Sequence, residues 1–171
     1  MNPNSTVTGF CVFAFLAGAG LAQATTAHRR SQTQDQQFLR TIAIADMTEA
    51  HAAEMAQDTA KGAPVKDFGQ TVVKDETQEY GELTVLASKA GANIPKGIDA
   101  RKNPAIRALM SRKGVNFDRD FLRYEIADER RVIEALQREA AHGQNPDIKA
   151  WAGKLIATRR QELQTAQSLA K

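Results

Sequence analysis

The sequence predicts an all-α protein, a four-helix bundle with a long crossover between its second and third long helices. Apolar residues recur at steps of three and four along four stretches of about 25 residues each, as core-facing helices require. No stretch alternates apolar and polar residues with period two over more than a few positions, which argues against strands. The break between the second and third stretches is long, whereas a simple up-and-down bundle needs only a short loop there.

The first two helices are expected over residues 35–60 and 64–90. Asp35 can cap the first of them, because aspartate is a favoured residue at helix N-termini. The segment Lys61-Gly62-Ala63-Pro64 then combines a glycine typical of a helix end with a proline suited to a first turn. Gly91 ends the second helix in the same way.

The remaining elements follow a long connection over residues 92–116. Within it, residues 104–112 can form a short helix after Asn103. The third long helix is expected over residues 117–141. The segment Gly-Gln-Asn-Pro then ends this helix and starts the next one, so the fourth helix is expected over residues 146–170.

The start of the chain predicts export. Residues 1–24 carry no charged side chain, and the apolar run from Phe10 to Leu21 is too short to span a bilayer as a helix. Ala-Gln-Ala follows, which is typical of a secretory signal peptide cleaved after Ala24. An uncleaved anchor is the alternative. Cleavage would make the mature protein periplasmic or secreted, without a transmembrane anchor.

The rest of the chain is expected to form one domain over residues 35–171, after a polar, flexible leader over residues 25–34. The single cysteine, Cys11, lies in the predicted signal peptide, so the mature chain would have no disulfide, thiolate zinc site or cysteine nucleophile. The net charge is +3, with both signs interspersed along the helices. This pattern favours a mixed-charge surface, and no nucleic-acid partner is expected.

One glutamate interrupts the apolar stripe of each long helix. A carboxylate in such a stripe is costly unless it is paired, protonated or bound to a metal. Each glutamate falls near the middle of its helix, so an antiparallel bundle would bring all four to one level. Glu79 and Glu125 lie one turn away and can join them. The sequence therefore predicts an internal cluster at mid-bundle around four residues, Glu49, Glu76, Glu129 and Glu162.

Three segments carry a resemblance to a known family: Val65-Lys66-Asp67-Phe68 with Val73-Lys74-Asp75-Glu76, Phe117 to Leu122, and Asn145 to Ala150. With their order and spacing, residues 35–169 resemble the exported bacterial domain-of-unknown-function family 4142, placed in the ferritin-like superfamily. The resemblance implies a ferritin-like four-helix bundle with the long crossover. It also implies a glutamate at Glu49 but histidine where this chain has Glu76, Glu129 and Glu162, so an inherited metal site does not simply carry over.

The sequence leaves three interpretations of the cluster open, the simplest being that the bundle ends are loose and the glutamates reach water by snorkelling. As a metal site, Glu49, Glu76, Glu129 and Glu162 would favour a hard divalent or ferric ion over zinc or copper. The chain has no Glu-x-x-His motif, and none of its three histidines, His28, His51 and His142, is well placed as a ligand. Alternatively, arginines neutralise the acids. Arg159 lies one turn before Glu162, and Arg123 and Arg130 flank the stripe of the third helix.

No catalytic constellation and no cofactor-binding motif is found. The serines lack histidine and aspartate partners, and no glycine-rich phosphate loop is present. We therefore expect an exported protein with a non-enzymatic structural or interaction role in the cell envelope, whose partner would be another envelope protein. The alternative is a carboxylate-lined bundle that binds or oxidises a metal.

Overall fold

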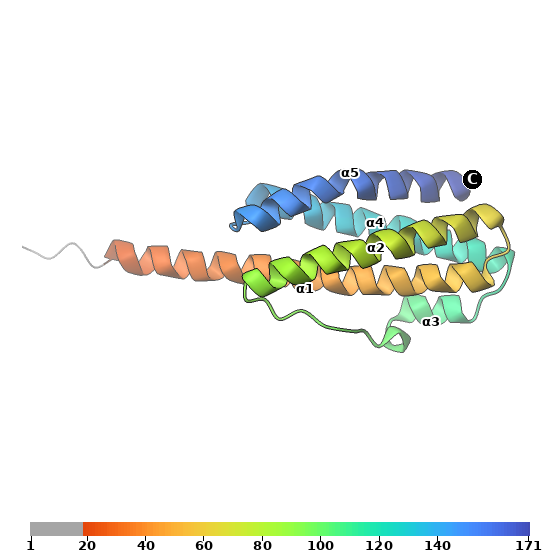
Figure 1. The fold of residues 1–171 in the computed structure, drawn as a ribbon, viewed down its shortest axis with the longest axis horizontal. Helices are drawn as coiled ribbons and strands as arrows, with labels where there is room; N and C mark the ends of the chain where they lie inside the picture. The colour runs from red at the N-terminus through yellow and green to blue at the C-terminus, as the bar shows by residue number, and fades with distance from the viewer. Residues whose placement is uncertain (1–18) are drawn as a thin grey trace, which may run out of the picture.

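The computed structural model describes the backbone of residues 19–171 and the side chains from Gln34 onward. Four long helices form the bundle, and two short helices lie in the crossover (Figure 1). The described residues contain no strand. The predicted all-α four-helix bundle with a long crossover is therefore confirmed, with the elements α1 (Ala19–Thr59), α2 (Ala63–Lys89), η1 (Ala100–Lys102), α3 (Pro104–Met110), α4 (Val115–His142) and α5 (Pro146–Leu169).

The long helices form two antiparallel hairpins, α1 with α2 and α4 with α5 (Figure 1). Across the two hairpins, α1 packs on α4 and α2 packs on α5. The crossover runs back along the length of the bundle and sets α3 against α1 and α4. This topology brings the middles of α2, α4 and α5 to the level of Glu49 on α1, which itself runs on beyond the other helices (Figure 1).

Local sequence signals explain the helix starts. The Asn103 side chain accepts a hydrogen bond from the backbone N–H of Ala105 at 2.9 Å and so caps α3. Asn145 caps α5 in the same way, accepting from Asp147 N at 3.0 Å. A proline follows each asparagine, and its missing N–H costs nothing in a first turn. These boundaries agree with the predicted ones.

The first helix differs from expectation. Helix α1 begins at Ala19, so the backbone of residues 25–34, the expected flexible leader, is helical. Extending a helix that has already formed needs no new nucleus, which allows a polar segment to continue it. Asp35 is consequently not an N-cap. The predicted signal peptide lies mostly outside the described residues, and its cleavage remains a prediction, as does the domain boundary at residue 35.

Asp35 instead joins α1 to the hairpin formed by α4 and α5. Its carboxylate accepts hydrogen bonds from the backbone N–H of Gln144 at 3.0 Å and of Asn145 at 2.8 Å, in the turn between α4 and α5. This role could not be predicted from local sequence, because the donors lie 109 and 110 residues further along the chain.

Two hydrophobic clusters fill the ends of the bundle. One contains Phe68, Phe117 and Phe121, and the other contains Phe38 and Trp151. Their sequence positions on each long helix leave the mid-level between them to polar residues. Apolar packing thus holds the bundle from both ends and fixes the helices around a polar centre.

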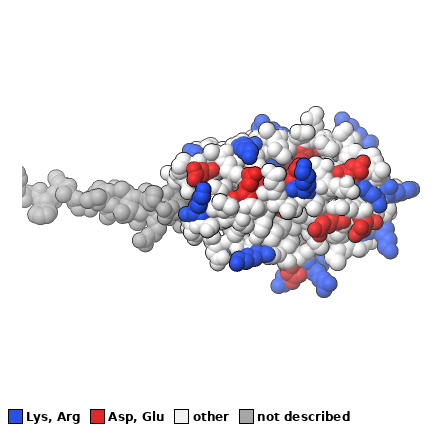
Figure 2. Space-filling model, viewed as in Figure 1, with Lys and Arg blue, Asp and Glu red and all other residues white. Residues whose placement is uncertain are grey.

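The surface carries both signs of charge. On the face shown in Figure 2, lysines and arginines are interspersed with aspartates and glutamates. No helix within the described part of the chain has the length and apolar character needed to cross a membrane.

Candidate metal centre

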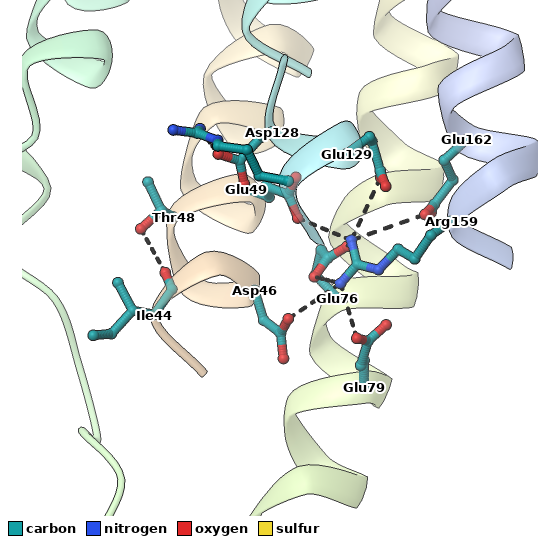
Figure 3. A network of polar contacts seen from close by, with 11 residues as sticks. Ile44, Asp46, Thr48, Glu49, Glu76, Glu79, Asp128, Glu129, Arg159 and Glu162 are labelled. Carbon is teal, nitrogen blue, oxygen red and sulfur yellow. Dashed lines mark hydrogen bonds and ion pairs between the residues drawn. The ribbon is translucent and has the colours of Figure 1, made fainter. Parts of the chain in front are cut away.

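The structure brings the four predicted glutamates together at mid-bundle (Figure 3). Glu49 and Glu129 are 0% exposed, Glu76 is 1% exposed and Glu162 is 5% exposed. One carboxylate oxygen from each of Glu49, Glu76 and Glu129 lies within 4.8 Å of the others. Oxygens at such separations can share a single cation.

One arginine lies at the centre of these acids. Arg159, from α5, is 0% exposed, and its Nη1 atom lies 2.9 Å from Glu49 and 3.5 Å from Glu129. Both terminal nitrogens of the guanidinium, Nη1 and Nη2, donate hydrogen bonds to the carboxylate of Glu76, with Nη2 at 2.8 Å from Oε2. Glu162 is more distant, at 3.9 Å from Nη1. The internal arginine network considered from the sequence therefore exists, with Arg159 as its cation (Figure 3).

Three further acids belong to the cluster. Asp46 and Glu79 lie 3.1 Å and 2.9 Å from Nη2 of Arg159. Glu125 is 0% exposed, and neither of its oxygens accepts a hydrogen bond. Helical spacing anticipated Glu79 and Glu125 but missed Asp46. Asp46 lies three residues before Glu49, a spacing compatible with the same helix face, but Ala45, four residues before it, fits that face equally well.

The other charged residues weighed from the sequence lie elsewhere. Arg123 is exposed and pairs with Asp120, 3.8 Å away, and Arg130 is exposed. His51 is on the surface beside Glu54, and His142 is exposed at the end of α4. The side chain of His28 lies outside the described residues. Among the described residues, the cluster thus consists of seven acids and one arginine: Asp46, Glu49, Glu76, Glu79, Glu125, Glu129, Glu162 and Arg159.

Burial changes the acidity of these groups. Desolvation raises the pKa of Glu76, and likewise of Glu125, well above the ordinary value, although the charge of Arg159 opposes it. Desolvation, followed by the charge of Glu49, raises the pKa of Glu129 to about 10. Desolvation raises the pKa of Glu162 to about 7, against the opposing charge of Arg159. Without another cation, several of these acids hold protons at neutral pH.

The unpaired oxygens are concentrated on one side of the cluster. Glu125, Glu129 and Glu162 together offer six carboxylate oxygens, and five of them accept no hydrogen bond. Buried polar atoms without partners are rare in proteins and call for an explanation. Protons shared between these residues would supply one, and so would an ion beside the convergent oxygens of Glu49, Glu76 and Glu129, which surround Nη1 of Arg159.

The donor chemistry selects among ions. The groups that contact Arg159 are all carboxylates, with no imidazole or sulfur donor. Carboxylate oxygens suit hard cations such as Ca²⁺, Mn²⁺ and Fe³⁺, whereas Cu⁺ prefers sulfur ligands. The residues present therefore fit a hard cation and do not fit a soft one.

Comparison with known proteins places the fold. The chain is similar to CopM in the Cu(I)-bound form, with 17% identity, a TM-score of 0.67, and coverage of 78% of this chain and 93% of that one. The Cu(II)-bound form of CopM gives a TM-score of 0.65 at 17% identity, covering 80% and 95% of the two chains. A conserved hypothetical protein, rv2844, from Mycobacterium tuberculosis gives 0.67 at 12% identity, covering 82% and 92%.

At these identities the likeness concerns the fold alone. Comparison with curated protein sequences finds no match. The sequence model for the domain of unknown function DUF4142 matches residues 20–169, which is most of the chain. This protein therefore belongs to the DUF4142 family.

Proposed function

We propose that this protein is an exported, non-enzymatic helical bundle that binds a hard cation, such as Mn²⁺, Ca²⁺ or Fe³⁺, at mid-bundle. One observation carries the proposal: within the described residues, six buried carboxylates contact a single buried guanidinium, and a seventh, that of Glu125, is buried without a hydrogen bond. Arg159 can balance one negative charge. The others must hold protons or a second cation, because uncompensated buried charge is strongly unfavourable.

The acids of α1 and α2 and those of α4 and α5 have different surroundings in the cluster. Arg159 binds the acids of α1 and α2, most closely Glu76. Glu125, Glu129 and Glu162, from α4 and α5, carry five of the eight carboxylate oxygens of the cluster that accept no hydrogen bond. An ion would take ligands from these oxygens and from the convergent oxygens of Glu49, Glu76 and Glu129. When bound, the ion would supply positive charge and take oxygen ligands. Two hydrophobic clusters, one on either side, would hold the ligands in place.

The comparisons support metal binding as a use of this fold. CopM has been solved with copper and with silver bound, and also in the apo form. The donor set of the present chain points to a harder ion, since oxygen ligands alone bind soft ions poorly. Binding is proposed in preference to oxidation, because no histidine contacts the cluster in the described residues. Export is supported by the signal-peptide pattern before Ala24.

Metal analysis and thermal melting test the proposal. Protein purified without chelator should contain a hard cation, and the melting temperature of metal-free protein should rise with added Mn²⁺, Ca²⁺ or Fe³⁺, because a ligand that binds the folded state stabilises it. The double substitution Glu125→Gln with Glu129→Gln should abolish both effects. Glu134→Gln, an exposed change on the same helix, should preserve them. Absence of metal, with a melting temperature indifferent to all three ions, would refute the proposal.

A second candidate is a purely structural bundle, which Arg159 itself favours. The buried guanidinium of Arg159 already contacts acids on all four long helices, its own included, and can serve as the cation of a structural network. In that case the acids left over stay protonated, and the protein acts through its surface in the envelope. The same melts separate the two candidates, since a structural network gains nothing from added ions.

A further inference from the structure

A groove runs along the seam between α2 and α5, the two helices that belong to different hairpins. Its volume is about 470 Å³, and its lining includes Phe68, Thr71, Asp75, Thr158 and Glu162. A smaller hollow of about 150 Å³ continues along the same seam. It shares Asp75 and Thr158 with the groove.

The groove leads to the carboxylate cluster. Glu162 lines the groove, and Glu79 lines the adjoining hollow. These two acids are each 5% exposed, whereas the other five acids of the cluster and Arg159 are 0–1% exposed. The cluster is therefore closest to solvent along the α2–α5 seam.

The chemistry of the groove suits a cation. Its lining includes three acids, Asp67, Asp75 and Glu162, together with threonine and glutamine side chains, and no lysine or arginine. Asp75 lies close enough for its charge to raise the pKa of Glu162. Glu162 is nearly buried, and neither of its oxygens accepts a hydrogen bond. A buried carboxylate that accepts no hydrogen bond thus stands between the groove and the cluster.

A rival route exists on the other side of the bundle. A hollow of about 260 Å³ between α1 and α4 is lined by Thr41, Tyr124, Asp128 and Arg131, among others. Arg131 pairs with Asp128 there, and its positive charge opposes an approaching cation. Glu49, Glu125 and Glu129, on the two helices that form this hollow, are fully buried.

We propose that the α2–α5 groove is the entrance through which a hydrated hard cation reaches the buried cluster, with Asp75 as its first carboxylate contact and Glu162 as the second. This proposal rests on the proposed function. It adds a prediction that the buried cluster alone does not make. Closing the groove should slow entry and release by the same factor, and the dissociation constant should stay the same, because a route affects rates and not the end states.

Mn²⁺ kinetics test the entrance. Entry is followed by rapid mixing of metal-free full-length protein with Mn²⁺, and release by mixing loaded protein with an excess of fluorescent chelator. Thr158→Phe fills the groove from an exposed position. Thr77→Phe places the same ring on an exposed site of α2 outside it, and Thr41→Phe fills the rival hollow. Thr158→Phe alone should slow both rates, about tenfold or more, with the dissociation constant changed less than twofold.

A second variant keeps the test decisive if the phenylalanine disturbs folding. Asp75→Asn removes the outer carboxylate at nearly constant shape, and Asp58→Asn removes an exposed one on α1 outside the groove. Only the first should slow Mn²⁺ entry. Slowing by Thr41→Phe, or no slowing by any variant of a protein that binds Mn²⁺, would overturn the entrance and leave the site intact. A wild-type protein that binds no Mn²⁺ at equilibrium, and no Ca²⁺ or Fe³⁺ in the melts, would overturn both proposals.

Discussion

Acids in two regions of this molecule meet opposite surroundings. At the bundle ends, Asp118 accepts hydrogen bonds from the backbone N–H groups of Lys61 and Gly62, both at 2.9 Å, and Asp35 does the same in the other hairpin turn. At mid-bundle, six of the seven buried acids share one guanidinium, and several oxygens have no donor at all.

The difference separates two uses of one residue type. A turn carboxylate with two fixed backbone donors is satisfied by the fold itself and fastens one hairpin to the other. The mid-bundle acids are not satisfied by the fold, so they depend on protons or ions that can come and go. Substitutions in the turns should therefore change stability alone, whereas conditions such as pH and ion concentration should act through the centre.

The largest expected effect is the loss of the central cation. Arg159→Met leaves the mid-bundle acids without a guanidinium and should lower the free energy of unfolding by about 3–5 kcal/mol. Urea unfolding measures this change, with the exposed neighbour substitution Arg160→Met as control. Added Mn²⁺ should recover part of the loss in Arg159→Met. Equal stabilities of the two variants would show that the centre does not need its arginine.

The pH dependence of metal-free protein should come next. Because burial raises the pKa of Glu162 to about 7 and that of Glu129 to about 10, the folded state keeps protons that the unfolded chain releases above about pH 4.5. Through these groups the free energy of unfolding should fall as pH rises, mainly between pH 4.5 and 7 for Glu162 and on to 10 for Glu129.

Urea midpoints measured from pH 5 to 9 would reveal this slope. Saturating Mn²⁺ should flatten or reverse it, because the ion competes with protons for the same oxygens. Stability that rises steadily with pH in metal-free protein would contradict the assignment of raised pKa values to the centre.

Smaller effects are expected in the turns. Asp118→Ala should cost about 1–3 kcal/mol of unfolding free energy, since two backbone N–H groups lose their acceptor. Asp35→Ala should behave alike in the other turn. Neither substitution should change the affinity for Mn²⁺, and a calorimetric titration checks this. A turn variant that lost the ion would erase the distinction between the two regions.

The smallest effect serves as a baseline. Glu134 and Arg138 form an exposed pair on α4 at 3.4 Å. Glu134→Gln should change the unfolding free energy by no more than about 0.5 kcal/mol, because water and salt screen such pairs. A larger loss, measured by urea unfolding, would mean that exposed ion pairs also stabilise this protein, and not only the buried acids and Arg159.

Local signals made most of the fold predictable. Gly62 with Pro64 marks one hairpin turn, and Asn145 with Pro146 marks the other, because their backbone preferences act within a few residues. The four stripe glutamates, and Arg159 as their neighbour, followed from helical spacing. Their identity as metal ligands remains a prediction.

What could not be predicted depends on packing between distant segments. Asp46 was missed because its neighbour Ala45 also fits the stripe, and only the rotation of α1 in the bundle decides between them. The role of Asp35 depends on a turn more than a hundred residues away. The groove between α2 and α5 arises where the two hairpins pack together, so the sequence of neither helix alone predicts it.

The crossover ties the two hairpins together along one edge only. Its short helix α3 packs on α1 and α4, so the crossover covers that edge of the bundle. Among the described residues, it does not cover the edge where α2 faces α5 (Figure 1). The groove beside the acids is accordingly walled by α2 and α5 alone, without any residue of the crossover. Insertions or deletions in the crossover can therefore vary while the lining of this groove stays the same.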